Sequence, residues 1–227
     1  MPGTDSATYA GVVGVVVALA LWTPVTGRAL AQVVTLVHEL GHALVGLAVG
    51  GRVQRLSLSL DASGETLALV GGRHPKARLT AFTVAGYPAP PLAGLLAAAA
   101  VASEDHRLLL LLSAVVVAAA LVLWVRNLWG IVVFVATAAG LWLAATEAGD
   151  GVTRTVAIAA AWLFSLGGLR SAWQLTHGRA PSAAPLDDAE RIAQLTRVLP
   201  RSLVVVGFVA VALVCLVGVV VLLVSPT

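Results

Sequence analysis

The residues best suited to chemistry form a His-Glu-x-x-His pattern, His38-Glu39-Leu40-Gly41-His42, inside an apolar run. On a helix, His38 and His42 are four residues apart, so both imidazoles project from one face and can bind a single metal ion. Imidazole suits Zn²⁺, and a catalytic zinc site has three protein ligands and an open position for water. Zinc lowers the pKa of that water to ~7, and Glu39 is placed to act as the general base. The pattern therefore predicts a catalytic zinc centre.

The apolar surroundings strengthen this prediction. An ionisable residue in a membrane interior costs on the order of 2.5 to 3.5 kcal/mol on insertion scales unless it is paired or liganded. Three such residues within five positions therefore need a charged partner, hydrogen bonds or a bound metal to offset this cost. The alternative is a polar cluster satisfied by hydrogen bonds between helices, without a metal. Chance is a poor explanation of the pattern in a chain with five histidines.

The third ligand must come from another part of the chain. The extended zincin pattern would require a histidine at position 48, which is Ala48. Asp187 and Asp188 begin an amphipathic stretch, and two interpretations remain open for them. One is a ligand that reaches the histidines, and the other is a pair of acids that starts a surface helix and complements its dipole. The remaining histidines are expected to be solvated loop residues: His74, His106 and His177.

The composition defines the environment of this motif. Of 227 residues, 59% are hydrophobic and only 11% are charged, whereas soluble domains have a charged fraction of about 25%. We expect a single integral membrane domain, residues 1–227, of the all-α polytopic class, because spans of ~20 residues allow about six or seven crossings. The spans are predicted at 9–24, 29–50, 78–101, 107–125, 128–146, 153–175 and 202–224.

The first predicted span is short. It either forms a tight hairpin with the second span or does not cross the membrane, in which case six spans remain. A signal peptide is the alternative for this run, but the segment before it carries Asp5 and no basic residue, so the run is expected to be retained.

Two segments are not spans. Residues 51–73 alternate, with Leu56 and Leu58 on one face and Ser57 and Ser59 on the other, which predicts a β-hairpin at the cytoplasmic surface. Residues 178–200 are polar and are predicted to form a cytoplasmic amphipathic loop.

The net charge of +3 does not indicate nucleic acid as a partner, because the basic residues are scattered and form no dense stripe. Three of the 14 basic residues, Arg28, Arg107 and Arg154, fall on one side of the seven-span topology, and the remaining eleven fall on the other. The positive-inside rule then predicts a multi-pass cell-membrane protein whose N-terminus and zinc-side loops are cytoplasmic. Cys215 is the single cysteine, so no internal disulfide is possible.

Several motifs together resemble those of the M50 (site-2-type) intramembrane metalloproteases, and most of all their compact M50B-like bacterial branch. They are His38-Glu39-Leu40-Gly41-His42, Gly50-Gly51-Arg52-Val53, Ser63-Gly64-Glu65-Thr66, Ala85-Gly86-Tyr87-Pro88, Arg126-Asn127-x-x-Gly130 and Leu186-Asp187-Asp188-Ala189. In that branch a Ser-Asp-Ala motif supplies the third ligand. The resemblance makes Asp188 that ligand and Asp187 the second choice. The sequence departs from the branch at Asp187, and it lacks the Asn-Pro-Asp-Gly or Leu-Asp-Gly motif of better-studied members.

The resemblance implies an intramembrane zinc endopeptidase that cleaves transmembrane protein substrates in or near the lipid bilayer. His38, His42 and Asp188 would hold Zn²⁺, and Glu39 would activate the water. Gly86 and Tyr87 are expected in a cavity wall that contacts substrate, because non-helical backbone at membrane depth needs protein or a water cavity beside it; a simple proline kink is the alternative. Asn127 is expected to hydrogen-bond an extended substrate or to stabilise the site; a short cytoplasmic turn is the alternative.

Two other functions remain as alternatives. One is a non-proteolytic zinc-binding scaffold, or a partner-binding protein of the same fold. The other is a metal transporter, which predicts ionisable residues in several spans, whereas most spans here lack charge. The substrate and the oligomeric state have no recognisable signal in the sequence.

Overall fold

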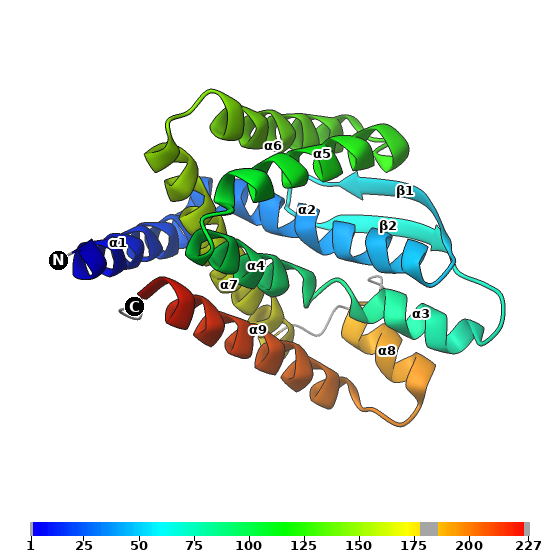
Figure 1. Ribbon diagram of the computed structural model, residues 1–227. Coiled ribbons are helices and arrows are strands. Elements are labelled where there is room, and N and C mark those ends of the chain that lie inside the picture. The colour runs from blue at the N-terminus through cyan, green and yellow to red at the C-terminus, as the bar shows by residue number, and fades with distance from the viewer. Residues whose placement is uncertain (1, 178–185, 225–227) are drawn as a thin grey trace.

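The computed structural model describes residues 2–177 and 186–224 and is a bundle of helices with one small antiparallel sheet (Figure 1). The elements are α1 Pro2–Trp22, α2 Pro24–Ala48, β1 Arg52–Leu58, β2 Gly64–Leu69, α3 Pro75–Val84, α4 Ala89–Ala102, α5 His106–Trp124, α6 Leu128–Thr146, α7 Asp150–His177, α8 Asp188–Thr196 and α9 Arg201–Val224. This arrangement confirms the expected all-α polytopic class with a β-hairpin after the helix that carries the histidines.

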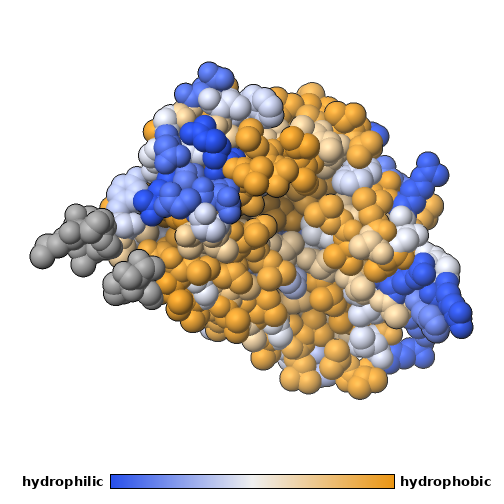
Figure 2. Space-filling view, viewed as in Figure 1, coloured by the Kyte–Doolittle hydropathy of each residue, from blue (hydrophilic) through white to orange (hydrophobic). Residues whose placement is uncertain are grey.

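Among the described residues, five helices are long and apolar enough to cross a membrane: α2, α5, α6, α7 and α9. A sixth candidate span consists of α3 and α4 together, which are bent by 59° at their junction. Figure 2 shows a broad apolar surface in the middle of the molecule, with hydrophilic residues gathered toward its two ends. An apolar belt between polar ends suits a helical bundle surrounded by lipid.

The predicted span at 78–101 is interrupted. α3 ends at Val84, and α4 begins at Ala89 with prolines at its first positions. Proline lacks a backbone N–H and is tolerated in the first turn of a helix, so Pro90 and Pro91 favour a new helix start over a continuous span. The break leaves residues 85–88 as a turn packed beside α2, with Gly86 buried.

Close helix packing holds this break against the bundle. A β-carbon on Gly41 of α2 would lie 2.8 Å from the carbonyl oxygen of Ala85, and one on Gly168 of α7 would lie 2.6 Å from Cδ of Pro91. Small residues at such crossings let helix backbones approach closely, which is how helices associate in lipid. The glycines therefore fix α2 and α7 against the two sides of the α3–α4 junction.

The direction of α1 differs from the expected topology. The Arg154 guanidinium, at the start of α7, donates a hydrogen bond to the Ser6 hydroxyl at 3.1 Å, and Arg170, later in α7, donates to the Leu21 carbonyl at 2.6 Å. α1 and α7 thus run in the same direction. Figure 1 places the N-terminal end of α1 at the opposite end of the bundle from α3 and α8. The N-terminus and the zinc-side loops thus lie at opposite ends of the bundle, whereas the expected topology placed them together, because a count of basic residues does not detect the packing of α1 along α7.

The hairpin packs into the bundle with one face. β1 and β2 are antiparallel, and Leu56 and Leu58 of β1 are fully buried against α5 and α6. Leu56 also forms a parallel bridge with Val125 at the end of α5. Apolar residues at alternate positions of a strand share one face, so the Leu56–Leu58 alternation directs this face inward. The hairpin is consequently a wall of the site.

Candidate metal centre

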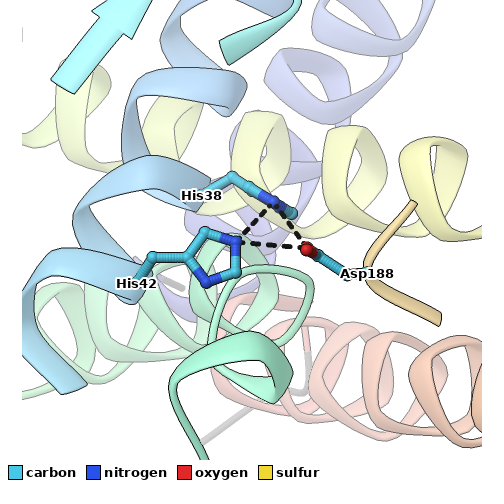
Figure 3. A group of neighbouring side chains, drawn as sticks. All are labelled: His38, His42 and Asp188. Atoms are coloured by element: carbon cyan, nitrogen blue, oxygen red, sulfur yellow. Dashed lines mark hydrogen bonds and ion pairs between the residues drawn. The ribbon is translucent and has the colours of Figure 1, made fainter. Parts of the chain in front are cut away.

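The two motif histidines lie on the inner face of α2 and point toward Asp188, which is the first residue of α8 (Figure 3). Nε2 of His38 and Nε2 of His42 are 3.1 Å apart. Oδ2 of Asp188 lies 3.1 Å from Nε2 of His42 and 3.3 Å from Nε2 of His38. Three ligand-type atoms from residues up to 150 positions apart in the sequence thus converge on one point.

The separations of these atoms fit a small tetrahedral metal ion. Zinc binds imidazole nitrogen and carboxylate oxygen at about 2.0 to 2.2 Å, so the ligand atoms of a tetrahedral site are separated by roughly 3.3 to 3.5 Å. The three measured separations, 3.1 to 3.3 Å, lie close to that value. Two imidazoles and one carboxylate are also a ligand set that zinc uses in catalytic sites.

Asp188 is the first residue of α8, and the residue before it, Asp187, caps the helix. The Asp187 side chain accepts a hydrogen bond from the Glu190 N–H at 2.8 Å, and the Glu190 side chain accepts from the Asp187 N–H at 3.3 Å, which is a capping box. Arg201 donates to Oδ2 of Asp187 at 2.6 Å. The acids therefore divide the two expected roles between them: Asp187 caps the helix, and Asp188 faces the histidines.

The electrostatics of Asp188 reflect this position. Burial acts to raise the pKa of its carboxyl, but the adjacent imidazoles of His38 and His42 outweigh burial and hold the pKa below its usual value. Asp188 is consequently a carboxylate at neutral pH, which is the form that binds a metal.

The backbone at the end of α3 orients one imidazole. Nδ1 of His42 donates to the Phe82 carbonyl at 2.7 Å, which leaves Nε2 of His42 free to bind a metal. Metal-binding histidines commonly use such a hydrogen bond to fix their tautomer and ring orientation. Tyr87 packs edge-on against His38 at 4.8 Å and stacks on Phe208 of α9 at 4.8 Å. The broken span thus supplies contacts to both rings.

Gly86 lies directly against both histidines. A β-carbon at this position would be 2.4 Å from Nε2 of His42 and 2.5 Å from Nε2 of His38. These distances are only slightly longer than zinc–nitrogen bonds of about 2.0 to 2.1 Å. A side chain on residue 86 would therefore take the space between the two nitrogens, and glycine keeps that space available.

Glu39 is buried beside the cluster and is held by the hairpin. The Thr66 hydroxyl of β2 donates a hydrogen bond to Oε2 of Glu39 at 2.7 Å. The same hydroxyl lies 3.2 Å from the Glu39 carbonyl oxygen. A β-carbon on Gly64 would be 2.6 Å from Oε1, so the first residue of β2 also lies against this carboxylate. Strand β2 therefore fixes the orientation of Glu39, the one acid of the motif.

The three residues predicted to contact substrate do not all lie at the metal centre. Gly86 and Tyr87 lie at the cluster, as described above, but Asn127 contacts the hairpin instead. Its Oδ1 accepts from the Leu58 N–H at 3.2 Å, and its Nδ2 donates to the Leu58 carbonyl at 2.6 Å. This side chain thereby extends the edge of β1, as a neighbouring strand would do.

The other three histidines stay outside the cluster. His74 and His177 are exposed, as expected. His106 is buried, with Nε2 3.3 Å from Oδ1 of Asp150, so its prediction as a solvated loop residue is wrong. α5 begins at His106 itself, and packing of this helix start against the start of α7 encloses the ring.

Several contributors were not foreseen from the sequence. Thr66 belongs to the Ser63–Thr66 motif, but no pattern indicated its contact with Glu39. The Phe82 carbonyl and the Arg201 guanidinium have no sequence signal at all, because their partners are 40 and 14 positions away.

Comparison with known proteins agrees with the geometry. A family model described as Peptidase M50B-like matches residues 11–219, which include both histidines, the hairpin, the α3–α4 break and Asp188. No curated protein and no solved structure matches the chain. Because the match covers most of the chain, the protein belongs to the Peptidase M50B-like family, a family of membrane metallopeptidases.

Proposed function

We propose that this protein is an intramembrane zinc endopeptidase that hydrolyses peptide bonds of other membrane proteins. The observation that carries the proposal is the convergence of Nε2 of His38, Nε2 of His42 and Oδ2 of Asp188 at 3.1 to 3.3 Å. His38, His42 and Asp188 would hold the ion, with Asp187 as the second-choice ligand. Bound zinc supplies a Lewis acid that makes a water nucleophilic near neutral pH and polarises the scissile carbonyl.

Glu39 is the proposed general base. It takes a proton from the attacking water and passes it to the leaving amine. The Thr66 hydrogen bond to Oε2 keeps the carboxylate in one orientation. Orientation matters because a catalytic group must lie within hydrogen-bond reach of the proton that it moves.

The substrate class follows from where the site lies. All three ligands are at most partly exposed, and the surrounding helices are apolar enough to span a bilayer. A transmembrane segment is the substrate that such a site would meet, and its helix must unwind, since the carbonyls of a helix are already hydrogen-bonded. We propose Gly86 and Tyr87 as part of the wall that contacts this unwound segment. Asn127 would act indirectly, by holding β1.

The side of the membrane is part of the proposal. α3, α8 and the segments that flank them, residues 52–78 and 186–201, carry eight of the 14 basic residues, which favours a cytoplasmic location for that end of the bundle in a cell membrane. The N-terminal end of α1 would then face the other side.

The test is a Glu39→Gln variant, which keeps the size of the side chain but removes the base. We expect wild-type zinc content and no cleavage of a co-expressed single-span membrane protein, and Glu65→Gln, at an exposed hairpin position, serves as the control. Cleavage at the wild-type rate by Glu39→Gln would refute the base assignment. Stoichiometric zinc in a wild-type protein that cleaves none of a panel of single-span proteins would favour the non-proteolytic scaffold.

A further inference from the structure

A polar cavity lies along the N-terminal half of α2, and its lining reaches Thr35, three residues before His38. Its volume is about 380 Å³, and it is enclosed by the turn between α1 and α2, the hairpin turn and the later part of α7. Its polar lining includes Arg28 and Thr35 of α2, Asp61 of the hairpin turn, and Arg170 and Gln174 of α7. Neither the zinc chemistry nor the proposed mechanism uses these residues.

The cavity and the metal centre share one face of α2. Arg28, Thr35, His38 and His42 follow one another at intervals of seven, three and four residues, which places them in a single stripe along a helix. The hairpin covers both parts of this stripe. The Thr35 hydroxyl donates to the Ala62 carbonyl at 2.8 Å, and the Thr66 hydroxyl lies beside Glu39, four residues farther along α2. Thr35 lines the cavity and lies about one helical turn before His38, so the cavity and the metal centre are adjacent along α2.

The charges in the cavity favour an anionic group. Arg28 is exposed to the cavity, and Arg170 donates to the Leu21 carbonyl at its floor. The one acid in the lining, Asp61, accepts hydrogen bonds from the N–H and hydroxyl of Ser63 at 3.0 and 2.7 Å. The first turn of α2 contains no acid, so the positive end of its dipole adds to the two arginines.

We propose that this cavity is a substrate subsite that binds an acidic side chain of the extended peptide. The inference rests on the proposed proteolytic function. Arg28 and His38 are ten residues apart on one helix, roughly 15 Å at 1.5 Å per residue. An extended peptide covers that distance in about four or five residues at 3.3 Å each. The subsite therefore selects Asp or Glu four or five positions from the scissile bond.

The experiment has a cleavage arm and a binding arm. Single-span substrates carry Asp, Asn or Lys at the fourth or fifth position on either side of the cleaved bond. Wild type is compared with Arg28→Glu, with the milder Arg28→Gln, and with Arg73→Glu, which changes an exposed loop arginine outside the cavity. The binding arm measures the affinity of peptides with the same sequences for the Glu39→Gln protein, alone and combined with Arg28→Glu or with Arg28→Gln.

We expect wild type and Arg73→Glu to prefer Asp over Lys about tenfold on one side of the bond, the equivalent of 1.4 kcal/mol. Arg28→Glu should reverse that preference, and Arg28→Gln should abolish it, in both arms. An Asp-over-Lys ratio that is the same in all four proteins would overturn the subsite while leaving the protease intact. Absence of cleavage together with an Arg28-dependent binding preference would instead overturn the proteolytic function and keep the subsite.

A phosphate-bearing lipid headgroup is the competing occupant. It predicts that Arg28→Glu slows cleavage of every substrate equally, and only in vesicles that contain an anionic phospholipid. That result would overturn the peptide subsite.

Discussion

Gly86 lies against His42 so closely that a β-carbon on residue 86 would be 2.4 Å from Nε2 of the imidazole. The same β-carbon would be 2.5 Å from Nε2 of His38, so a single methyl group would fill the space between the two proposed ligands. The break between α3 and α4 thus places backbone that carries no side chain against the metal centre. This contact links the interrupted span to the chemistry of α2.

Replacement of Gly86 by alanine is expected to abolish zinc binding, because the added methyl group takes the place of the ion. The zinc-to-protein ratio of purified Gly86→Ala should fall from about one toward zero, as expected for a site with one ion. Gly140→Ala is the matched control, since a β-carbon at Gly140 meets nothing within 4 Å. One zinc per Gly86→Ala molecule would show that the ion does not lie between the histidines.

Asp188 and Asp187 should differ in their effect on zinc affinity. Asp188→Asn removes a charged ligand, and we expect affinity to fall by more than the 10- to 100-fold typical of residues that only support a ligand. Asp187→Asn keeps a good helix cap but loses the ion pair with Arg201, so its loss should stay within that range. Competition titration against a chelating dye measures both. Equal losses would argue against the division of roles.

Thr66 should affect turnover and not metal content. Thr66→Val keeps the shape of the side chain but removes the hydroxyl that holds Oε2 of Glu39, and loss of one such hydrogen bond predicts a fall in kcat of about tenfold. Thr66→Ser retains the hydroxyl and should recover most of the rate. KM and the zinc-to-protein ratio should be unchanged in both variants. A change confined to KM would place Thr66 in substrate binding instead.

Asn127 should control the stability of the hairpin. Asn127→Ala leaves the N–H and carbonyl of Leu58 without their partners, which costs about 1 to 3 kcal/mol for each buried group. Hydrogen exchange of residues 56–66 should accelerate, while exchange in α9 stays unchanged. Asn127→Asp keeps the acceptor for the Leu58 N–H and should show a smaller effect. Equal exchange in wild type and Asn127→Ala would mean that the hairpin does not depend on this side chain.

Zinc removal should lower thermal stability only when the site is intact. A ligand at 100 times its dissociation constant stabilises the folded state by about 2.7 kcal/mol. Addition of zinc to the chelator-treated protein should therefore raise the midpoint of thermal unfolding in wild type but not in His38→Ala. An equal rise in both proteins would indicate zinc binding elsewhere.

The sequence by itself determined the features that depend on local geometry. Helical periodicity places His38 and His42 on one face of any helix that contains them, and the apolar composition requires a membrane-embedded helical bundle. The alternation around Leu56 and Leu58 specified the hairpin, because the period of a strand is two residues. The motifs quoted from residue 38 to residue 189 also carried the family resemblance, which the family match confirms.

Only the tertiary structure decided how distant segments meet. The local preference for acids at a helix start applies equally to Asp187 and Asp188. The docking of α8 on α3 and α9 made Asp187 the N-cap and directed Asp188 toward the histidines. The direction of α1, the burial of His106 and the pairing of Asn127 with Leu58 likewise depend on packing between segments 44 to 149 residues apart. Spacing along a helix is set by its backbone geometry, whereas such long-range contacts are selected by the shape and polarity of the surfaces that pack together.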